Sequence, residues 1–282
     1  MTYLVRLGGL GDLLVALPAI RLVRSVLPAE RLVFVGRADG GLLLQEKSVV
    51  DFAASADEAR WAPMIAAFSG QTPRRLDVDP EAAGLGPDDL VLGWFHGREE
   101  GRIRRPLFRF FFETTEEYFR RRGFVLPPFG ACAGLPVRED GKTKKDHFAV
   151  IHPGSGSARK CWPLDRFLAV AAALAAREIG GLLVTGEAEG RLEAGLREAS
   201  FPAGWAWKPY PPLVDLAALL SRADLYVGND SGVTHLAAAC GARVVALFRD
   251  EFKDAWRPAG DVRLLSAPDV ADIPLSSVLS AV

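Results

Sequence analysis

The sequence 224-DLYVGNDSGVTHLAAACG-241 indicates the fold, because it passes from a strand to a helix through a short polar turn. Residues 224–227 are mostly apolar and of strand type, residues 229–232 favour a helix start, and Gly241 favours a helix end. A strand that leads directly into a helix is the repeating unit of α/β proteins with parallel sheets. The free N–H groups at such a helix start can also bind an anion.

The same strand–helix unit recurs on both sides of a short charged segment, residues 138–146. In the second half we expect further strands at 148–152, 181–185 and 243–248, the last being the final core strand, and helices at 163–177 and 213–222. In the first half we expect strands at 3–7, 32–35 and 90–95, a weaker strand near Val49, and helices after Asp12 and at 57–68. The sequence therefore predicts two Rossmann-like domains with parallel sheets, residues 1–142 and 143–282.

Composition excludes several classes of protein. The 282 residues carry a formal net charge of −1, which argues against a general nucleic-acid binder. No apolar run approaches the ~18 residues of a spanning helix, and because the opening residues are of strand type we expect no signal peptide. The three cysteines show no paired spacing, which favours a reduced, cytoplasmic compartment. The four histidines form no metal-binding cluster, so we expect no tightly held metal.

A glycine-rich turn, Gly8-Gly9-Leu10-Gly11-Asp12, follows the first strand. Glycines such as Gly9 and Gly11 let a backbone approach a ligand at the start of a helix. Asp12 has two interpretations, a helix N-cap or a carboxylate that takes a proton from an acceptor hydroxyl. The turn lacks the G-x-G-x-x-G spacing of dinucleotide-binding folds, which makes a dehydrogenase the least favoured function.

Two loops of the second half carry groups that suit a nucleoside diphosphate. The loop 153–160 offers small residues, two hydroxyls and two cations, with Ser155, Gly156, Ser157 and Lys160 as candidate phosphate ligands. The alternative is a flexible polar loop with solvated cations. Glu187 follows the strand 181–185, where it is either a ribose ligand or an acid favoured by the helix dipole.

The turn quoted first carries the largest group of candidate ligands. Ser231 and Gly232 place free N–H groups at a helix start, and His235 lies one turn beyond Asp230 and Ser231 on the same face. In the alternative interpretation Asp230 only caps the helix and His235 only packs. Three polar side chains that converge at one helix start favour an anion site.

Together these segments resemble glycosyltransferase family 9, the ADP-heptose:lipopolysaccharide heptosyltransferases. The resemblance rests on the glycine turn with the residues around it (5–12 and 17–20), on His152-Pro153-Gly154 with Lys160-Cys161-Trp162-Pro163, on Gly186-Glu187, on the stretch 224–238, and on Trp256-Arg257-Pro258. It implies the GT-B class, in which two Rossmann-like domains face each other across a cleft, and a metal-independent, inverting transferase.

The resemblance also implies a role for each candidate residue. Asp12 would be the general base, Lys160 with Ser155 and Gly156 would hold the donor phosphates, and Glu187 would bind the ribose. Asp230, Ser231, Gly232 and His235 would hold the diphosphate and the donor sugar. The expected donor is a nucleoside-diphosphate sugar, ADP-heptose above others, and the expected acceptor is an anionic glycolipid or glycan of the bacterial surface.

The first half departs from the family where the acceptor is expected. The strand region reads Val91-Leu92-Gly93-Trp94-Phe95-His96 where the family often has a strand ending in Asp-Leu-Gln. Five arginines lie between Arg98 and Arg109, and Arg120, Arg121 and Arg122 follow. They form either a solvated cationic surface or a landing surface for an anionic glycolipid or the headgroups of the inner membrane. A nucleotide-sugar epimerase and a non-catalytic nucleotide-sugar-binding protein remain alternatives.

Overall fold

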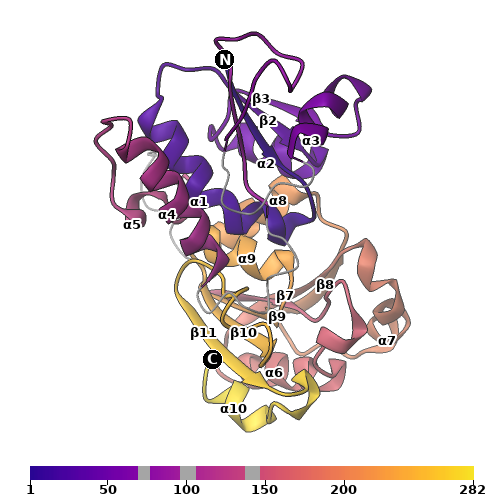
Figure 1. Ribbon diagram of the computed structural model, residues 1–282. Coiled ribbons are helices and arrows are strands. Elements are labelled where there is room, and N and C mark those ends of the chain that lie inside the picture. The colour runs from indigo at the N-terminus through magenta and orange to yellow at the C-terminus, as the bar shows by residue number, and fades with distance from the viewer. Residues whose placement is uncertain (69–76, 96–105, 137–146) are drawn as a thin grey trace. The chain divides into compact units, whose positions relative to one another are not determined.

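The computed structural model describes residues 1–68, 77–95, 106–136 and 147–282, and at residues 187 and 188 the backbone alone (Figure 1). The chain divides into two compact units, Met1–Val137 and Arg138–Val282. The boundary predicted between residues 142 and 143 lies outside the described residues. Within the described ranges no helix is both long and apolar enough to cross a bilayer.

The N-terminal unit is a five-stranded sheet with helices. Its elements are β1 (Thr2–Arg6), α1 (Leu10–Val26), β2 (Leu32–Gly36), α2 (Ala38–Glu46), β3 (Phe52–Ser55), η1 (Ala59–Trp61), α3 (Ala62–Phe68), β4 (Asp77–Val78), β5 (Leu90–Gly93), α4 (Leu107–Arg120) and α5 (Phe129–Cys132). The strand order is β3-β2-β1-β5-β4. Every residue of β1 and β2 is buried, as expected for parallel strands covered on both faces.

Three expectations for this unit need correction. The sheet is not wholly parallel, because the two-residue strand β4 pairs antiparallel with β5. The strand expected near Val49 begins at Phe52, and the helix expected over 57–68 divides into η1 and α3.

Helix α4 was not predicted, because the arginines around it suggested a cationic surface. Its buried residues Leu107, Phe108, Phe111, Phe112, Thr115 and Phe119 recur every three or four positions, which is the spacing of one helix face. Figure 1 shows α4 beside α1, and Phe112 packs with Leu22 of α1 in one apolar cluster. The indole N–H of Trp94 donates to the Thr115 hydroxyl at 2.9 Å, which ties α4 to the end of β5.

The C-terminal unit is a six-stranded, wholly parallel sheet. Its elements are β6 (Phe148–His152), η3 (Ala158–Lys160), α6 (Leu164–Ala175), β7 (Gly180–Thr185), η4 (Glu187–Leu192), α7 (Glu193–Glu198), β8 (Trp205–Pro209), α8 (Leu213–Arg222), β9 (Leu225–Asn229), α9 (Gly232–Ala239), β10 (Arg243–Arg249), β11 (Val262–Ala267), η5 (Val270–Asp272) and α10 (Leu275–Leu279). Strands β8 and β11 at the two edges were not predicted, so β10 is not the last strand as expected.

The strand order β11-β10-β9-β6-β7-β8 determines where this unit can bind a ligand. The chain runs outward from β6 through β7 to β8, and then returns to β9 on the other side of β6. This is the order of the dinucleotide-binding fold, and its winding reverses between β6 and β9. Ligands of such sheets bind beyond the carboxyl ends of the strands at this point.

Candidate functional site

The carboxyl ends of β6 and β9 are joined by one buried side chain. The Asn229 amide donates to the carbonyl oxygens of Pro153 and Gly154 at 2.9 and 3.3 Å, and its oxygen accepts the N–H of Trp162 at 3.0 Å. Asn229 has no solvent exposure. It therefore fixes both ends of the loop 153–162 against the turn that leads into α9. The sequence indicates Asn229 only as part of a helix start at 229–232, whereas in the structure it is the last residue of β9 and bridges the two loops.

An ion pair between Lys160 and Asp230 links the loop 153–162 to the turn before α9. Lys160 Nζ lies 2.6 Å from Asp230 Oδ2, with the ammonium 4.7 Å from the centre of the Phe252 ring. The Ser155 hydroxyl donates to the Asp230 carbonyl oxygen at 2.8 Å and is buried. The structure thus brings Ser155, Lys160 and Asp230 together as predicted, but the Ser155 hydroxyl contacts protein backbone in this arrangement.

Ser231 is the N-cap of α9, and its hydroxyl oxygen accepts the N–H of Thr234 at 3.4 Å. The alternative in which Asp230 caps this helix is therefore wrong. Gly232 is the first residue of α9, where N–H groups have no partner within the helix. His235 is buried in the same helix. The start of α9 thus presents N–H groups next to the Lys160 ammonium, which is a suitable environment for an anion.

A histidine and a glutamate lie beneath the loop. His152 Nε2 is 3.5 Å from Glu189 Oε2, and both side chains are 4% exposed. Glu189 also accepts the N–H of Gly186 at 2.7 Å. Burial raises the pKa of Glu189, but the hydrogen bonds from His152 and from the Gly186 N–H outweigh burial and leave the pKa below its usual value. The carboxylate form is thus stabilised inside the protein.

The other residues predicted in this unit are more open or not described. Gly156 and Ser157 are exposed at the tip of the loop, and a Cβ at Gly156 would meet no atom within 4 Å. Glu187 begins η4 beside the end of β7, and its side chain lies outside what the structure describes. Its predicted ribose contact therefore stays a prediction.

Asp12 lies in the first turn of α1 and is held by two neighbours. Its Oδ2 accepts the N–H of Gly9 at 2.9 Å, and its Oδ1 lies 2.8 Å from Arg6 Nη2. Gly9 is the N-cap, so Asp12 is the third residue of the helix and not its cap, and Gly11 is the second residue. Gly8 has a φ of 107°, and a Cβ there would lie 2.6 Å from Asp12 Oδ2. The glycine turn thus makes room for the carboxylate.

Arg6 is the last residue of β1 and is almost completely buried. Its guanidinium donates to the carbonyl oxygens of Asp12 and Trp94 at 2.8 and 2.7 Å and pairs with the Asp12 carboxylate. The side chain of Asp12 remains 27% exposed. A carboxylate that is oriented by protein donors and still reaches solvent can accept a proton from a bound hydroxyl.

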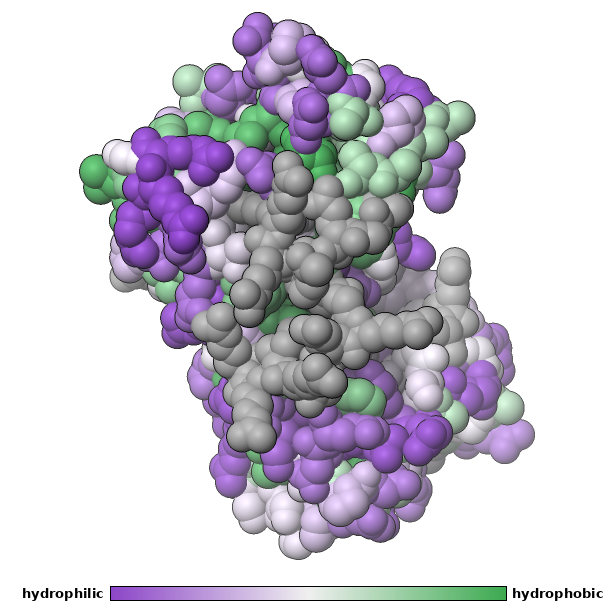
Figure 2. Space-filling view, viewed as in Figure 1, coloured by the Kyte–Doolittle hydropathy of each residue, from purple (hydrophilic) through white to green (hydrophobic). Residues whose placement is uncertain are grey.

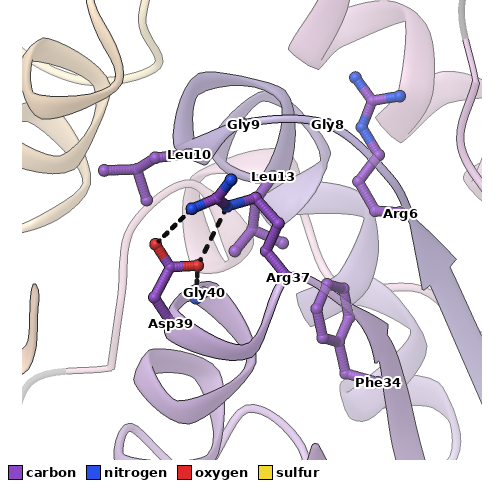
Figure 3. Close-up of a pocket in the computed structure, with 9 residues that line it drawn as sticks. All are labelled: Arg6, Gly8, Gly9, Leu10, Leu13, Phe34, Arg37, Asp39 and Gly40. Carbon is purple, nitrogen blue, oxygen red and sulfur yellow. Dashed lines mark hydrogen bonds and ion pairs between the residues drawn. The ribbon is translucent and has the colours of Figure 1, made fainter. Parts of the chain in front are cut away.

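A small, open pocket lies beside this turn (Figure 3). Figure 3 shows the backbone of Gly8 and Gly9 along one side and the paired side chains of Arg37 and Asp39 along another. The Arg37–Asp39 pair is 3.3 Å long and exposed, at the carboxyl end of β2. The pocket therefore joins the carboxyl ends of β1 and β2, where an α/β sheet binds ligands.

The predicted arginine surface lies partly outside the described residues, because positions 96–105 are not described. Arg109 lies with its guanidinium 3.9 Å from the centre of the Phe129 ring. Arg120, Arg121 and Arg122 are exposed and pair with Glu116, Glu117 and Asp77, respectively. Their charges are thus partly compensated, which weakens the idea of a strongly cationic surface.

Within the described ranges no group of three or more His, Cys, Asp or Glu side chains is arranged to hold a metal ion. Asp77 and Asp79 are separated by one residue in the sequence and are the kind of acid pair that can hold a cation. Asp77, however, lies in β4 and contacts Arg122 at 3.6 Å.

Sequence reasoning missed Glu189 and did not single out His152. A local signal for Glu189 was present, because Gly186 followed three residues later by an acid is a capping-box spacing. The same spacing joins Gly9 to Asp12. No local signal links His152 to Glu189, since they meet only when β6 and β7 pair.

The comparisons with known proteins point to one family. The sequence model of glycosyltransferase family 9 (heptosyltransferase) matches residues 127–266, which confirms the predicted resemblance. Lipopolysaccharide heptosyltransferase 3 of Escherichia coli (strain K12) is 35% identical over 120 residues, 40% of this chain and 34% of that protein. The chain thus matches about a third of this curated relative's length.

Solved structures extend the likeness to the whole fold. The E. coli ADP-heptose lps heptosyltransferase II has a TM-score of 0.72 at 18% identity, covering 100% of this chain and 97% of that chain. E. coli heptosyltransferase WaaC with ADP has a TM-score of 0.71 at 15% identity, covering 99% and 98%. At such identities the likeness concerns the fold, and it confirms the predicted GT-B class of two α/β units with parallel sheets.

Proposed function

We propose that this chain, whose residues 127–266 match the model of glycosyltransferase family 9, transfers a sugar from a nucleoside-diphosphate donor to a hydroxyl group of a bacterial surface glycolipid or glycan. The observation that carries this proposal is the group of Lys160, Asp230 and Ser231 at the reversal point of a dinucleotide-type sheet. The family match covers this group.

The donor side of the reaction needs a site for the leaving diphosphate. Lys160 supplies a cation, and the start of α9 at Ser231 and Gly232 supplies N–H donors. Asp230 neutralises Lys160 in the absence of donor, so a diphosphate must compete for the ammonium or add to the pair. We propose ADP-heptose as the donor, because the relatives are named for heptose transfer and one was solved with ADP.

The acceptor side needs a base. In an inverting transfer the acceptor hydroxyl attacks the anomeric carbon as the diphosphate leaves, and the hydroxyl proton goes to a carboxylate. We assign this role to Asp12, which Arg6 and the Gly9 N–H hold in one orientation. One displacement of this kind needs no metal, provided that the diphosphate charge is met by Lys160 and the helix start.

A membrane-bound acceptor agrees with the surface of the N-terminal unit. Among the residues that the structure describes, five of the six exposed large hydrophobic side chains lie there: Met1, Leu42, Phe52, Phe124 and Val125. Figure 2 shows mostly hydrophilic residues on the visible face of the C-terminal unit and more hydrophobic ones on that of the N-terminal unit. Phe124 and Val125 are exposed and lie one glycine beyond Arg120–Arg122, whose charges are partly compensated by acidic neighbours. We propose that this exposed apolar pair makes peripheral contact with the cytoplasmic face of the inner membrane.

Ligand binding followed by product analysis tests the proposal. A nucleoside diphosphate at 100 times its dissociation constant should stabilise the protein by about 2.7 kcal/mol, so we expect ADP to raise the unfolding temperature. ADP-heptose should then be consumed only when acceptor glycolipid is added. Conversion of the sugar without acceptor would instead show an epimerase, and binding without any turnover would show a non-catalytic binding protein. Absence of binding by every nucleoside diphosphate would refute the donor site itself.

A further inference from the structure

Three side chains form a chain of contacts from the interior of the C-terminal unit to the start of α9. Glu189 Oε2 lies 3.5 Å from His152 Nε2, and His152 Nδ1 lies 3.4 Å from the Ser231 hydroxyl oxygen. His152 and Glu189 are buried beneath the loop 153–162, and neither has a role in the transfer described above. The distances are long for hydrogen bonds, as is common in catalytic sites before substrate binds.

The chemistry of the three groups sets the direction of these contacts. An ionised carboxylate can only accept hydrogen bonds, so the imidazole nitrogen that faces Glu189 must carry a proton. In a neutral imidazole the other nitrogen, Nδ1, then has a lone pair that can accept the Ser231 hydroxyl proton, for which Thr234 Oγ1, 3.2 Å from the same hydroxyl, is the alternative acceptor. A lone pair of Ser231 is left to accept the N–H of Thr234, the capping bond that the structure contains.

The loop 153–162 leaves space for the Glu189 carboxylate at Gly154. A Cβ built at Gly154 would lie 2.0 to 2.5 Å from the side-chain atoms of Glu189. Only a residue without a side chain can therefore cross above Glu189 at this point. The N–H of Gly186 holds the same carboxylate from the other side at 2.7 Å.

We propose that Glu189 is a positioning residue, which holds His152 in the tautomer protonated at Nε2 and through it directs the Ser231 hydroxyl at the diphosphate site. Glu189 touches no substrate in this role. The inference rests on the proposed function, because Ser231 matters only if the start of α9 binds the donor diphosphate.

Nitrogen NMR of histidine tests the first half of the inference without any nucleotide. In protein labelled with ¹⁵N-histidine, the signals of His152 are those that disappear in His152→Asn. We expect them to report a neutral ring with its proton on Nε2. The variant Glu189→Leu should shift the ring toward the tautomer protonated at Nδ1. A parent ring protonated at Nδ1, or a ring that Glu189→Leu leaves unchanged, would overturn the assignment.

Affinity for ADP tests the second half. Partners that orient metal-bound histidines change affinity or activity by ~10- to 100-fold, and we expect about a tenfold weaker ADP complex for Glu189→Leu. Glu189→Gln should stay within about threefold of the parent, because its amide oxygen can accept the same imidazole N–H. The matched control is Glu193→Gln on the neighbouring helix α7. Glu193 pairs with the exposed Arg197 at 3.1 Å, and its substitution should leave ADP affinity unchanged.

A double-mutant cycle separates positioning from simple damage to the fold. If Glu189 acts through His152, the pair His152→Asn with Glu189→Leu should lose no more affinity than the worse single variant. Additive losses would contradict the proposal. A parent that binds no nucleoside diphosphate but shows the expected tautomer would refute the donor site and leave the Glu189–His152 pair intact. Equal ADP affinity in the parent and Glu189→Leu would refute positioning and leave the donor site intact.

Discussion

Two helix starts in this protein share one local arrangement and differ in their surroundings. In the N-terminal unit, Gly9 precedes α1 and its N–H donates to Asp12 at 2.9 Å. In the C-terminal unit, Gly186 precedes η4 and its N–H donates to Glu189 at 2.7 Å. Each acid is the third residue of its helix, and a glycine elsewhere in the unit makes room for each carboxylate.

The two acids differ in the exposure of their side chains and in their basic partners, which are Arg6 at the end of β1 and His152 at the end of β6. Asp12 is 27% exposed and pairs with Arg6, which is always charged. Glu189 is 4% exposed and pairs with His152, which can be neutral. The same capping arrangement can therefore present one acid to a substrate and hold another inside the protein to orient a neighbour. The role of each acid follows from its surroundings and cannot be inferred from the cap.

The largest expected effect is on the rate of transfer. Asp12→Asn keeps the shape of the side chain and an oxygen for the Gly9 N–H, but removes the base, and general-base help is worth ~10²–10⁴-fold. We expect a fall of that size in single-turnover rate at saturating donor, with ADP affinity unchanged. Glu189→Gln, the equivalent change at the other helix start, should alter the rate far less. An Asp12→Asn rate within threefold of the parent would remove Asp12 from the mechanism.

The second effect is on stability. Arg6→Met removes a buried cation that holds two carbonyl oxygens and the Asp12 carboxylate. Breaking a buried pair costs ~3–5 kcal/mol, and because Asp12 is partly exposed we expect about 2–4 kcal/mol from urea unfolding. The control is Arg37→Met, since the Arg37–Asp39 pair is 3.3 Å long and exposed, and such pairs contribute ~0–1 kcal/mol. Equal losses in both variants would show that burial of Arg6 contributes nothing.

The third effect is on donor affinity. Lys160→Ala removes the cation and leaves Asp230, 7% exposed, without its partner beside the proposed diphosphate site. A hydrogen bond to a charged group is worth ~1.5–3 kcal/mol, and we expect ADP binding by calorimetry to weaken by about that amount. Arg177→Ala, which removes a cation that donates to the carbonyl of Val282, is the control. Unchanged ADP affinity in Lys160→Ala would reduce Lys160 to a structural partner of Asp230.

The smallest effect is on the pH dependence of stability. Burial raises the pKa of Glu189, but the hydrogen bonds from His152 and the Gly186 N–H lower it by more than burial raises it. The pKa of Glu189 in the folded protein therefore lies below the usual value. A lowered carboxyl pKa stabilises the fold above the unfolded pKa of ~4.3, and this contribution is lost as pH falls through the folded pKa. Urea midpoints measured from pH 6 downward should therefore fall less steeply below pH ~4.3 in Glu189→Gln than in the parent. Parallel profiles would contradict the lowered pKa.

The sequence predicted the C-terminal unit better than the N-terminal unit, for physical reasons. Strand 148–152 and helix 213–222 have the predicted bounds, because a fully buried parallel strand is a short apolar run and α8 begins after a proline. The edge strands β8 and β11 have mostly exposed or half-buried residues and lack that signal. In the N-terminal unit the arginines flanking α4 hid its apolar face, and two-residue β4 exists only through its pairing with β5.

The sequence predicted those contacts of the candidate site that form between loops at the carboxyl ends of neighbouring strands. Lys160 and Asp230 were expected near each other because their loops follow strands that end at the same edge of the sheet, and they form a direct ion pair. The partner of Asp12 could not be read from the sequence, because Arg6 reaches it only once the turn at Gly8 has folded back. The contact of His152 with Glu189 likewise depends on the pairing of β6 with β7.

Each sheet is built from strands of one unit alone, β1 to β5 in the first and β6 to β11 in the second. No described strand is shared, so each half carries its own hydrogen-bonded framework. One half can therefore be exchanged or diversified without rebuilding the sheet of the other, and chimaeras joined between 137 and 147 are a natural way to recombine the two halves. The family model matches residues 127–266, whereas in the first half the strand region 91–96 departs from the family motif, which is the pattern expected when two halves diverge separately.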